Sequence, residues 1–491
     1  MERIRLQRAK KVASLAVLSA ATLLAAAACV AQEQYAKPLI HTPTDHPAAR
    51  VLLLSIDGLH AADLANWIVS HPHSALAELT ARGVTYTNAR SPSADPVAGL
   101  VSIATGGTPI STGILSSDGF DHALAPPNSN CKMSGTPLTL DQSLNTTSEI
   151  SGFDIAKLPR DPNHECAPMQ PHSLLRVNTM FEVVHEKIGS TAWAGESKAS
   201  TDILRGPSGK GLDEDCAAET GITSDSDMDR VAVILHWIDG RDCKGDHNIA
   251  VPSLFGMSFV SVGKAQASAG YIDSFGTPSP ALAKSLAATD NSIGRIIAER
   301  KTKQLYDTTW IFVTAPYCLS PMDSRQLRLI PLARLRAVAN STNPGIVLHI
   351  SGGSVGMVWL RDPAATAKVA KAYSEGAAAL GIQAIHIGAD LALALNPPSR
   401  DSRMPDIILQ PQPGVLWSAS GDPTRAAFGG TLEEDTHVAL LVSGVQLTGR
   451  CDPTLVPTTQ LAPLLLRALG MEKFDLQALH LEHSPALPGI F

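Results

Sequence analysis

A carboxylate at the end of an apolar run is the first group in this chain that could do chemistry. Asp57 follows the apolar residues 51–56 and precedes a glycine. Such a run is typical of a buried parallel strand, which delivers its last side chain to the crevice at the carboxyl edge of the sheet. Asp57 could bind a metal ion there. The alternative is a turn or helix-cap carboxylate, because Asp-Gly is a turn signal.

A second carboxylate stands at a strong helix start. Asp95-Pro96 combines an N-cap residue with a first-turn proline. The Asp95 side chain would occupy the positive end of the helix dipole, where other proteins bind a phosphate.

Other catalytic motifs are absent from the sequence or stand in the wrong context. The chain has no Gly-x-x-x-x-Gly-Lys-Ser/Thr loop and no His-Glu-x-x-His pair. Gly352-Gly-Ser-Val-Gly356 matches Gly-x-Ser-x-Gly, but it leads into an expected strand. A nucleophile elbow follows a strand and opens a helix. Ser354 is therefore not expected to be a nucleophile.

Alternating strand and helix patterns must position these groups. They predict an α/β fold with a doubly wound, mostly parallel sheet and helices on both faces. Residues 115–250 are richer in Pro, Ser, Asn, Asp and Gly and are expected to form an inserted cap over the carboxyl edge. We expect strands at 51–56, 84–88, 231–235, 258–262, 310–314, 356–360, 406–409 and 438–442, and helices at 61–69, 74–82, 280–300, 324–338, 363–380 and 459–469.

The N-terminus has the pattern of an export signal. A basic head precedes an apolar run over residues 12–29. A membrane anchor is the alternative, since eighteen residues are marginally long enough. Ala26-Ala-Ala-Cys29 resembles a lipoprotein signal that would place a lipid on Cys29, whereas cleavage after Ala31 would free the chain. We expect a signal over 1–31, a linker over 32–49, one large domain over 50–491, and a periplasmic or extracellular location, either lipid-anchored or free.

The charge of the mature chain limits its partners. Without the five basic residues of the signal and Glu2, 34 basic and 45 acidic residues remain, a net charge of −11. With 4% aromatic residues and no basic run, the chain is not expected to bind nucleic acid. Small phosphodiesters can still bind an acidic protein if metal ions supply positive charge. No protein partner follows from the sequence.

Six cysteines follow the signal, an even number that favours disulfides in an exported protein. No Cys-x-x-Cys spacing suggests a zinc site. Fifteen pairings are formally possible. Proximity suggests Cys131 with Cys166 and Cys216 with Cys243, which leaves Cys318 with Cys451.

Three segments near the start, 51–59, 82–88 and 104–113, resemble the opening of the type I phosphodiesterase/nucleotide pyrophosphatase branch of the alkaline phosphatase superfamily. The resemblance continues to about residue 490 and implies an alkaline-phosphatase-like fold. It also implies hydrolysis of phosphodiesters by a Ser or Thr nucleophile and two metal ions about 4 Å apart. Further segments that resemble one bacterial subgroup are 157–162, 175–182, 203–211, 251–257, 276–280, 437–443 and 487–490.

The resemblance assigns a residue to each site position, and few of these residues suit the chemistry. Pro96 stands at the nucleophile position, and Ser93 is the nearest weak substitute. Asp57 and Asp273 retain a carboxylate, although Asp273 could equally be a solvated loop acid. The lost metal-ligand positions are Thr277, Pro316, Tyr317 and Phe428.

We therefore expect an inactive or strongly impaired relative of these hydrolases, with a binding or envelope-interaction role toward a small phosphorylated ligand. Two carboxylates do not hold two zinc ions, although one weakly bound Mg²⁺ or Ca²⁺ remains an option. The alternative is an active metal-dependent phosphodiesterase or phosphatase with a rebuilt site. His60, three residues beyond Asp57, is the best replacement ligand.

Overall fold

A computed structural model describes residues 48–144, 153–216, 227–273, 275–393, 395–419, 421, 423–471 and 475–490. The expected signal peptide and nearly all of the linker lie outside these residues. Within these ranges, no helix is long and apolar enough to cross a membrane.

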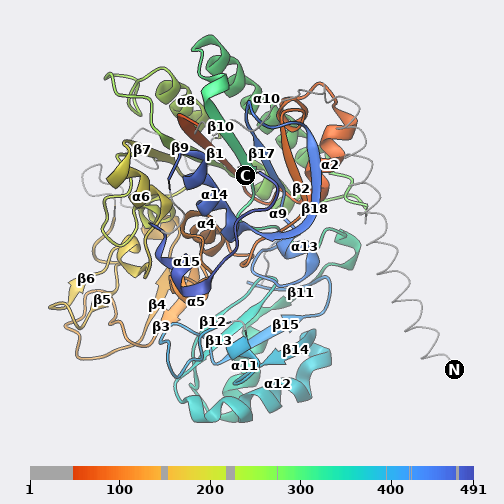
Figure 1. Cartoon of the computed structure of the whole chain (residues 1–491). Coiled ribbons are helices and arrows are strands. Elements are labelled where there is room, and N and C mark those ends of the chain that lie inside the picture. Colours follow the sequence, from red (N-terminus) through yellow and green to blue (C-terminus); the bar gives the residue numbers. More distant parts are fainter. Residues whose placement is uncertain are drawn as a thin grey trace.

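An eight-stranded sheet forms the centre of the molecule (Figure 1), in the order β18-β2-β17-β10-β1-β9-β7-β8. β17 runs antiparallel to both of its neighbours, and the other neighbouring pairs are parallel. The prediction of a mostly parallel sheet is confirmed. The strands are β1 (Arg50–Ile56), β2 (Gly83–Arg90), β7 (Thr191–Ala194), β8 (Glu214–Asp215), β9 (Leu254–Phe259), β10 (Thr309–Thr314), β17 (Leu440–Ser443) and β18 (Arg450–Pro457).

The position of β1 in the sheet explains why residues 51–56 are almost all apolar. β1 lies between β9 and β10, and all of its residues after Arg50 are buried. Two groups of helices cover the sheet and confirm the doubly wound α/β fold. One group is α3 (Ala75–Thr80), α8 (Asp227–Ile238), α9 (Ser261–Ser268) and α10 (Pro280–Thr302); the other is α4 (Pro96–Thr105), α6 (Met180–Lys187) and α14 (Leu461–Ala468).

Three expected elements were wrong or displaced. Residues 231–235 are helical and belong to α8, because buried side chains recur at Arg230, Ile234 and Trp237 with helical spacing. The strand expected at 258–262 ends at Phe259, and α9 begins two residues later. The helix expected at 324–338 begins only at Leu332, in α11 (Leu332–Thr342).

A smaller sheet has a core of its own, in the order β12-β13-β15-β14. Helices α11 and α12 pack on each other and on this sheet, which lies below the large sheet in Figure 1. A two-stranded parallel pair, β11 (Arg328–Pro331) with β16 (Val415–Ser418), accompanies it. The other elements are β12 (Val347–Ser351), β13 (Gly356–Leu360), α12 (Thr366–Leu380), β14 (Ile382–His386) and β15 (Ile407–Pro411).

Residues 115–250, the expected cap, contribute to two parts of the structure. Short antiparallel pairs lie outside the large sheet: β3 (Asp118–Asp121) with β4 (Thr136–Thr139), and β5 (Arg160–Asp161) with β6 (Ala167–Pro168). In contrast, α6, β7, β8 and α8 belong to the large sheet and its helices.

Two of the three expected disulfides are present. Cys131 is bonded to Cys166 and Cys216 to Cys243, with Cα atoms 5.9 and 6.0 Å apart. The third prediction was wrong, because Cys318 is a buried free thiol. Cys451 lies in the edge strand β18, separated from β10 by β2 and β17, whereas Cys318 follows β10.

Gly99 allows α4 to lie against the loop that follows β10. A Cβ atom at this position would collide with the carbonyl oxygen of Pro316. The Ser91 hydroxyl donates to that same oxygen at 2.6 Å. The start of α4 is therefore held against the loop that carries Pro316 and Tyr317.

Gly99→Ala should lower the free energy of unfolding by roughly 1–3 kcal/mol, because the added methyl group overpacks a rigid backbone contact. The matched control is Gly294→Ala in α10, where the nearest atom to the new Cβ is 3.6 Å away. That change should be neutral or stabilising by up to about 1 kcal/mol. Urea unfolding of both variants measures the difference. Equal stability of the two would show that α4 does not depend on this close approach.

Candidate functional site

A cavity of about 440 Å³ lies at the carboxyl end of β1. Its walls come from residues that follow β1, β7, β9 and β10, from α9, and from β16 beside the smaller sheet. This is the crevice in which open α/β sheets bind ligands. The side chains used below are Asp57, Glu196, Lys264, Tyr317, Leu319, Leu416, Trp417 and Phe428.

Asp57 occupies the strand-end position and lines this cavity. Asp57 is 7% exposed, and its Oδ2 accepts a hydrogen bond from the Tyr317 hydroxyl at 3.3 Å. Burial, together with the nearby Glu196 and Asp227 carboxylates, raises the pKa of Asp57 well above its usual range, against the opposing charge of Arg230. The carboxylate thus lies at the inner end of the cavity with little compensation for its charge.

Tyr317 and Phe428, two of the expected lost ligand positions, contact each other beside Asp57. Their ring centroids are 5.5 Å apart and their planes 70° apart. Tyr317 also packs in an apolar cluster with Leu319 and Ala426. Burial and the Asp57 carboxylate raise the pKa of Tyr317 well above its usual range, so the phenol stays protonated. The structure therefore brings these two positions together, as aromatic rings rather than imidazoles.

The N-terminus of α4 is occupied by the Asp95 side chain. Its Oδ1 accepts the backbone N–H groups of Val97 and Ala98, both at 3.0 Å. Its Oδ2 accepts the Ser116 hydroxyl at 3.1 Å and both the N–H and the hydroxyl of Ser117 at 2.8 Å. A phosphate would have to displace this buried carboxylate from the helix donors.

The nucleophile position and its substitute have no reactive group in the cavity. Pro96 is the first residue of α4 and its side chain carries no polar atom. Ser93 accepts the Asp95 N–H at 3.3 Å through its hydroxyl and does not line the cavity.

Asp273 is not brought to Asp57. Its Oδ1 accepts the N–H groups of Phe275 and Thr277 at 2.9 and 3.1 Å, and it does not line the cavity. Hydrogen bonding from Thr277 lowers the pKa of Asp273. This arrangement favours the solvated loop acid over a metal ligand. Pro316 likewise takes part only through its carbonyl oxygen, which accepts the Ser91 hydroxyl.

His60 is buried beneath the cavity and both of its ring nitrogens have partners. Nδ1 lies 3.1 Å from Asp63 Oδ2, and Nε2 lies 3.2 and 3.0 Å from the carbonyl oxygens of Leu319 and Glu434. Nδ1 also lies 3.0 Å from the Tyr271 hydroxyl and 3.4 Å from the Gln266 amide nitrogen. Burial opposes the charge, but Cys318 and Asp63 raise the pKa of His60 well above its usual range. Both ring nitrogens of His60 are directed to partners within the protein, and the residue does not line the cavity.

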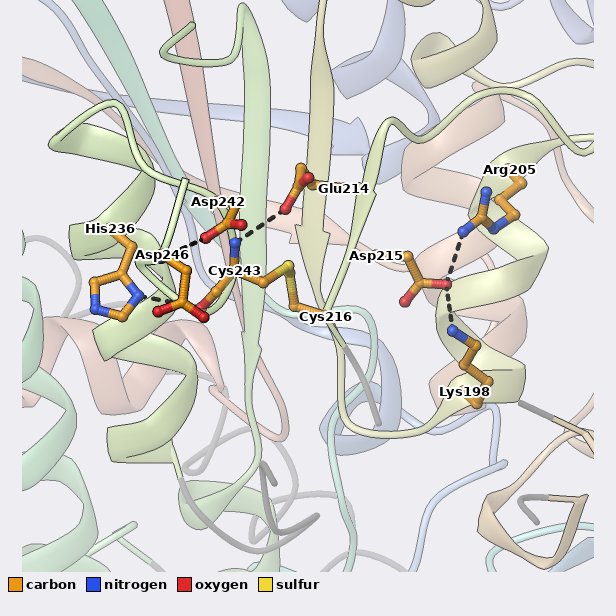
Figure 2. The surroundings of a disulfide bond; sticks show 9 residues. All are labelled: Lys198, Arg205, Glu214, Asp215, Cys216, His236, Asp242, Cys243 and Asp246. Carbon is orange, nitrogen blue, oxygen red and sulfur yellow. Dashed lines mark hydrogen bonds and ion pairs between the residues drawn. A yellow bond between two sulfur atoms is a disulfide. The ribbon is translucent and has the colours of Figure 1, made fainter. Parts of the chain in front are cut away.

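The residues present do not fit two zinc ions. Among the described residues that line the cavity, none is a histidine or a cysteine, the nitrogen and sulfur ligands that zinc favours. Elsewhere in the described ranges, one group of three ligand atoms lies close together, on Glu214, Cys216 and Cys243. Figure 2 shows that the two sulfur atoms form a disulfide and that Glu214 accepts the Cys243 N–H, at 3.0 Å. That group is therefore not a metal centre.

The profile of the type I phosphodiesterase/nucleotide pyrophosphatase family matches residues 51–435. The chain belongs to this family. The family's enzymes are hydrolases that normally use two zinc ions. No curated protein sequence matches the chain.

Solved structures of family members share the fold. Murine ectonucleotide pyrophosphatase/phosphodiesterase 5 has a TM-score of 0.59 at 15% identity, over 86% of this chain and 96% of its own. The human protein has a TM-score of 0.57 at 18% identity, over 89% and 96%. An inactive variant of the murine protein, in complex with AMP, has a TM-score of 0.57 at 16% identity, over 86% and 96%. This likeness confirms the alkaline-phosphatase-like architecture.

Sequence reasoning missed three side chains that line the cavity, Glu196, Lys264 and Trp417. Glu196 follows β7, whose four residues are too few for a clear period, and Trp417 lies in the four-residue β16. Lys264 is on α9, within a segment of low hydrophobicity that gave no helical signal. The short, mostly apolar runs at 191–194, before Glu196, and at 415–418, which includes Trp417, were the signals that could have located these strands.

The buried His60–Asp63 pair should make stability depend on pH. Because the folded pKa of His60 is raised, its stabilisation is complete below the unfolded value of about 6.5 and is lost as pH rises through the folded value. The free-energy difference between this chain and His60→Gln should therefore shrink from pH 6 upward. Asp63→Asn should show the same trend in urea unfolding. A difference that stayed constant to pH 9 would contradict a charged His60.

Proposed function

We propose that this protein is a non-catalytic member of its family whose Asp57 cavity binds a small ligand. The observation that carries the proposal is the contact between Tyr317 and Phe428, with the Tyr317 hydroxyl on Asp57. By the family resemblance, these two positions belong to metal-binding histidines. Their rings fill the space beside Asp57 and offer one protonated phenol in place of two imidazoles.

The start of α4 supports the same proposal independently. The murine relative bound to AMP is described as inactive after one threonine is replaced by alanine. In this chain Pro96 stands at the position where the resemblance places a hydroxyl nucleophile. Asp95 also occupies the helix donors that could hold a phosphate. The start of α4 therefore lacks both a hydroxyl nucleophile and free backbone donors for an anion.

Purified protein should contain well under two equivalents of zinc after dialysis against it, measured by elemental analysis. Hydrolysis of nitrophenyl phosphodiesters and monoesters with Zn²⁺, Mn²⁺, Mg²⁺ or Ca²⁺ should stay at background. Loss of nucleophile and metal ions together costs on the order of a millionfold or more in rate. Turnover that disappeared in Asp57→Ala would establish the alternative, an active hydrolase with a rebuilt site.

The double variant Tyr317→His and Phe428→His makes the metal test sharper. It restores two imidazoles next to Asp57, so zinc retention should rise above that of the unmodified chain. The matched control is Tyr317→Phe with Phe428→Tyr, which keeps two aromatic rings and adds no imidazole. Equal zinc retention in all three proteins would show that these positions do not belong to a metal site.

We also propose that the protein is exported, either free or with a lipid on Cys29. The disulfides Cys131–Cys166 and Cys216–Cys243 support an oxidising compartment. Expression in a Gram-negative host should yield a species shortened by about thirty residues. Cys29→Ser should abolish lipidation, measured by mass spectrometry, if the lipoprotein alternative holds. A full-length chain in the membrane fraction would contradict export with cleavage.

A further inference from the structure

The charged side chains that line the cavity are two carboxylates, Asp57 and Glu196, and one amine, Lys264. No arginine or histidine lines it within the described part of the chain. In a two-metal hydrolase, the metal ions are the largest local charges and attract the anionic substrate. Without them, the sign of the field near Asp57 is wrong for a phosphate.

The Asp57 carboxylate lies at the inner end of the cavity, and few groups compensate its negative charge. Among the described residues, the side chain that hydrogen-bonds to the Asp57 carboxylate is Tyr317, whose hydroxyl donates to one of the two oxygens at 3.3 Å. Arg230, a buried cation whose charge acts on Asp57, donates to Asp227 at 2.6 Å and to the Ser258 carbonyl at 2.8 Å. Arg230 is thus paired with Asp227, and Asp57 lines the cavity.

Lys264 does not reach this inner position as an ion-pair partner. Its Nζ lies 3.7 Å from the Glu196 carboxylate, and the side chains are 43% and 29% exposed. The pair lies toward solvent, where such a contact contributes little. Lys264 offsets the charge of Glu196 and leaves that of Asp57.

The remaining walls of the cavity are largely apolar. Leu319, Leu416, Trp417 and the rings of Tyr317 and Phe428 line it, and Phe428 is 37% exposed. An aromatic face attracts a cation that is held within about 6 Å of it. The volume of about 440 Å³ lies in the range of small-molecule pockets.

We propose that the cavity binds an organic ammonium ion, with its charge against Asp57 and its apolar body against Tyr317 and Phe428. This inference rests on the proposed non-catalytic binding role and replaces the small phosphorylated ligand expected from the family with a ligand of opposite charge.

Three probes with one apolar body test the charge of the ligand: 2-phenylethylammonium, 2-phenylethanol and 2-phenylethyl phosphate. Calorimetric titration of the mature chain should give measurable affinity for the ammonium ion. Affinity should be on the order of tenfold lower, or more, for the alcohol and for the phosphate. Stronger binding of the phosphate than of the ammonium ion would overturn the inference, as would absence of ammonium binding.

Charge variants give effects of opposite sign for the two kinds of ligand. Asp57→Asn and Glu196→Gln should each weaken ammonium binding, and Lys264→Met should strengthen it. An anion would show the reverse pattern. The control is Glu375→Gln in α12, where the side chain is 69% exposed. This change should leave ammonium binding unaltered. Circular dichroism and urea unfolding check that each variant folds, and Glu196→Gln keeps the test intact if Asp57→Asn does not fold.

The same proteins separate this inference from the proposed function. If hydrolysis stays at background and the phosphate is the probe that binds most tightly, the non-catalytic binding role stands and the ammonium ligand is refuted. Metal-dependent hydrolysis that is lost in Asp57→Asn would refute the non-catalytic role itself.

Discussion

The site depends on how one buried carboxylate is compensated at the end of the central strand. β1 lies between two parallel neighbours, so its last side chain must emerge at the carboxyl edge of the sheet. A carboxylate removed from water there requires a cation, hydrogen bonds or a proton. In two-zinc hydrolases, metal ions fill that need. Here the Tyr317 hydroxyl gives one long hydrogen bond and Phe428 packs on the Tyr317 ring.

The proposed loss of catalysis rests on both halves of a phosphate site. Metal ions would neutralise a phosphate from one side, and free helix donors would bind it from the other. Aromatic side chains stand at the first half, and the Asp95 carboxylate takes up the donors at the second. Because Asp95 also accepts from Ser116 and Ser117, that second change is built into the hydrogen bonding of the following loop.

The sequence predicted those helices and strands whose residues form a clear local pattern. The strand before Asp57 and the helix start at Asp95-Pro96 both form as expected. The strand prediction for residues 231–235 failed because a run of five apolar residues suits a buried strand or a helix equally. The Cys318–Cys451 disulfide was predicted wrongly because the order of strands in a sheet depends on contacts between residues that are far apart in the sequence. The cavity wall at Trp417 was missed for the same reason, since β16 reaches it by pairing with β11.

Hydrogen bonds within the chain hold the loops around the cavity together. His60 Nε2 binds the carbonyl oxygens of Leu319 and Glu434, and so joins the loop after β10 to the segment before β17. The Ser320 hydroxyl donates to Asp435 at 2.6 Å, and the Cys318 N–H donates to the Asp435 carbonyl at 3.0 Å. These bonds join segments that carry Tyr317 and follow Phe428. Under the proposed function, substitution at a ligand position would therefore remove a metal contact without releasing the loop that bears it, and the residues facing the cavity could suit another ligand.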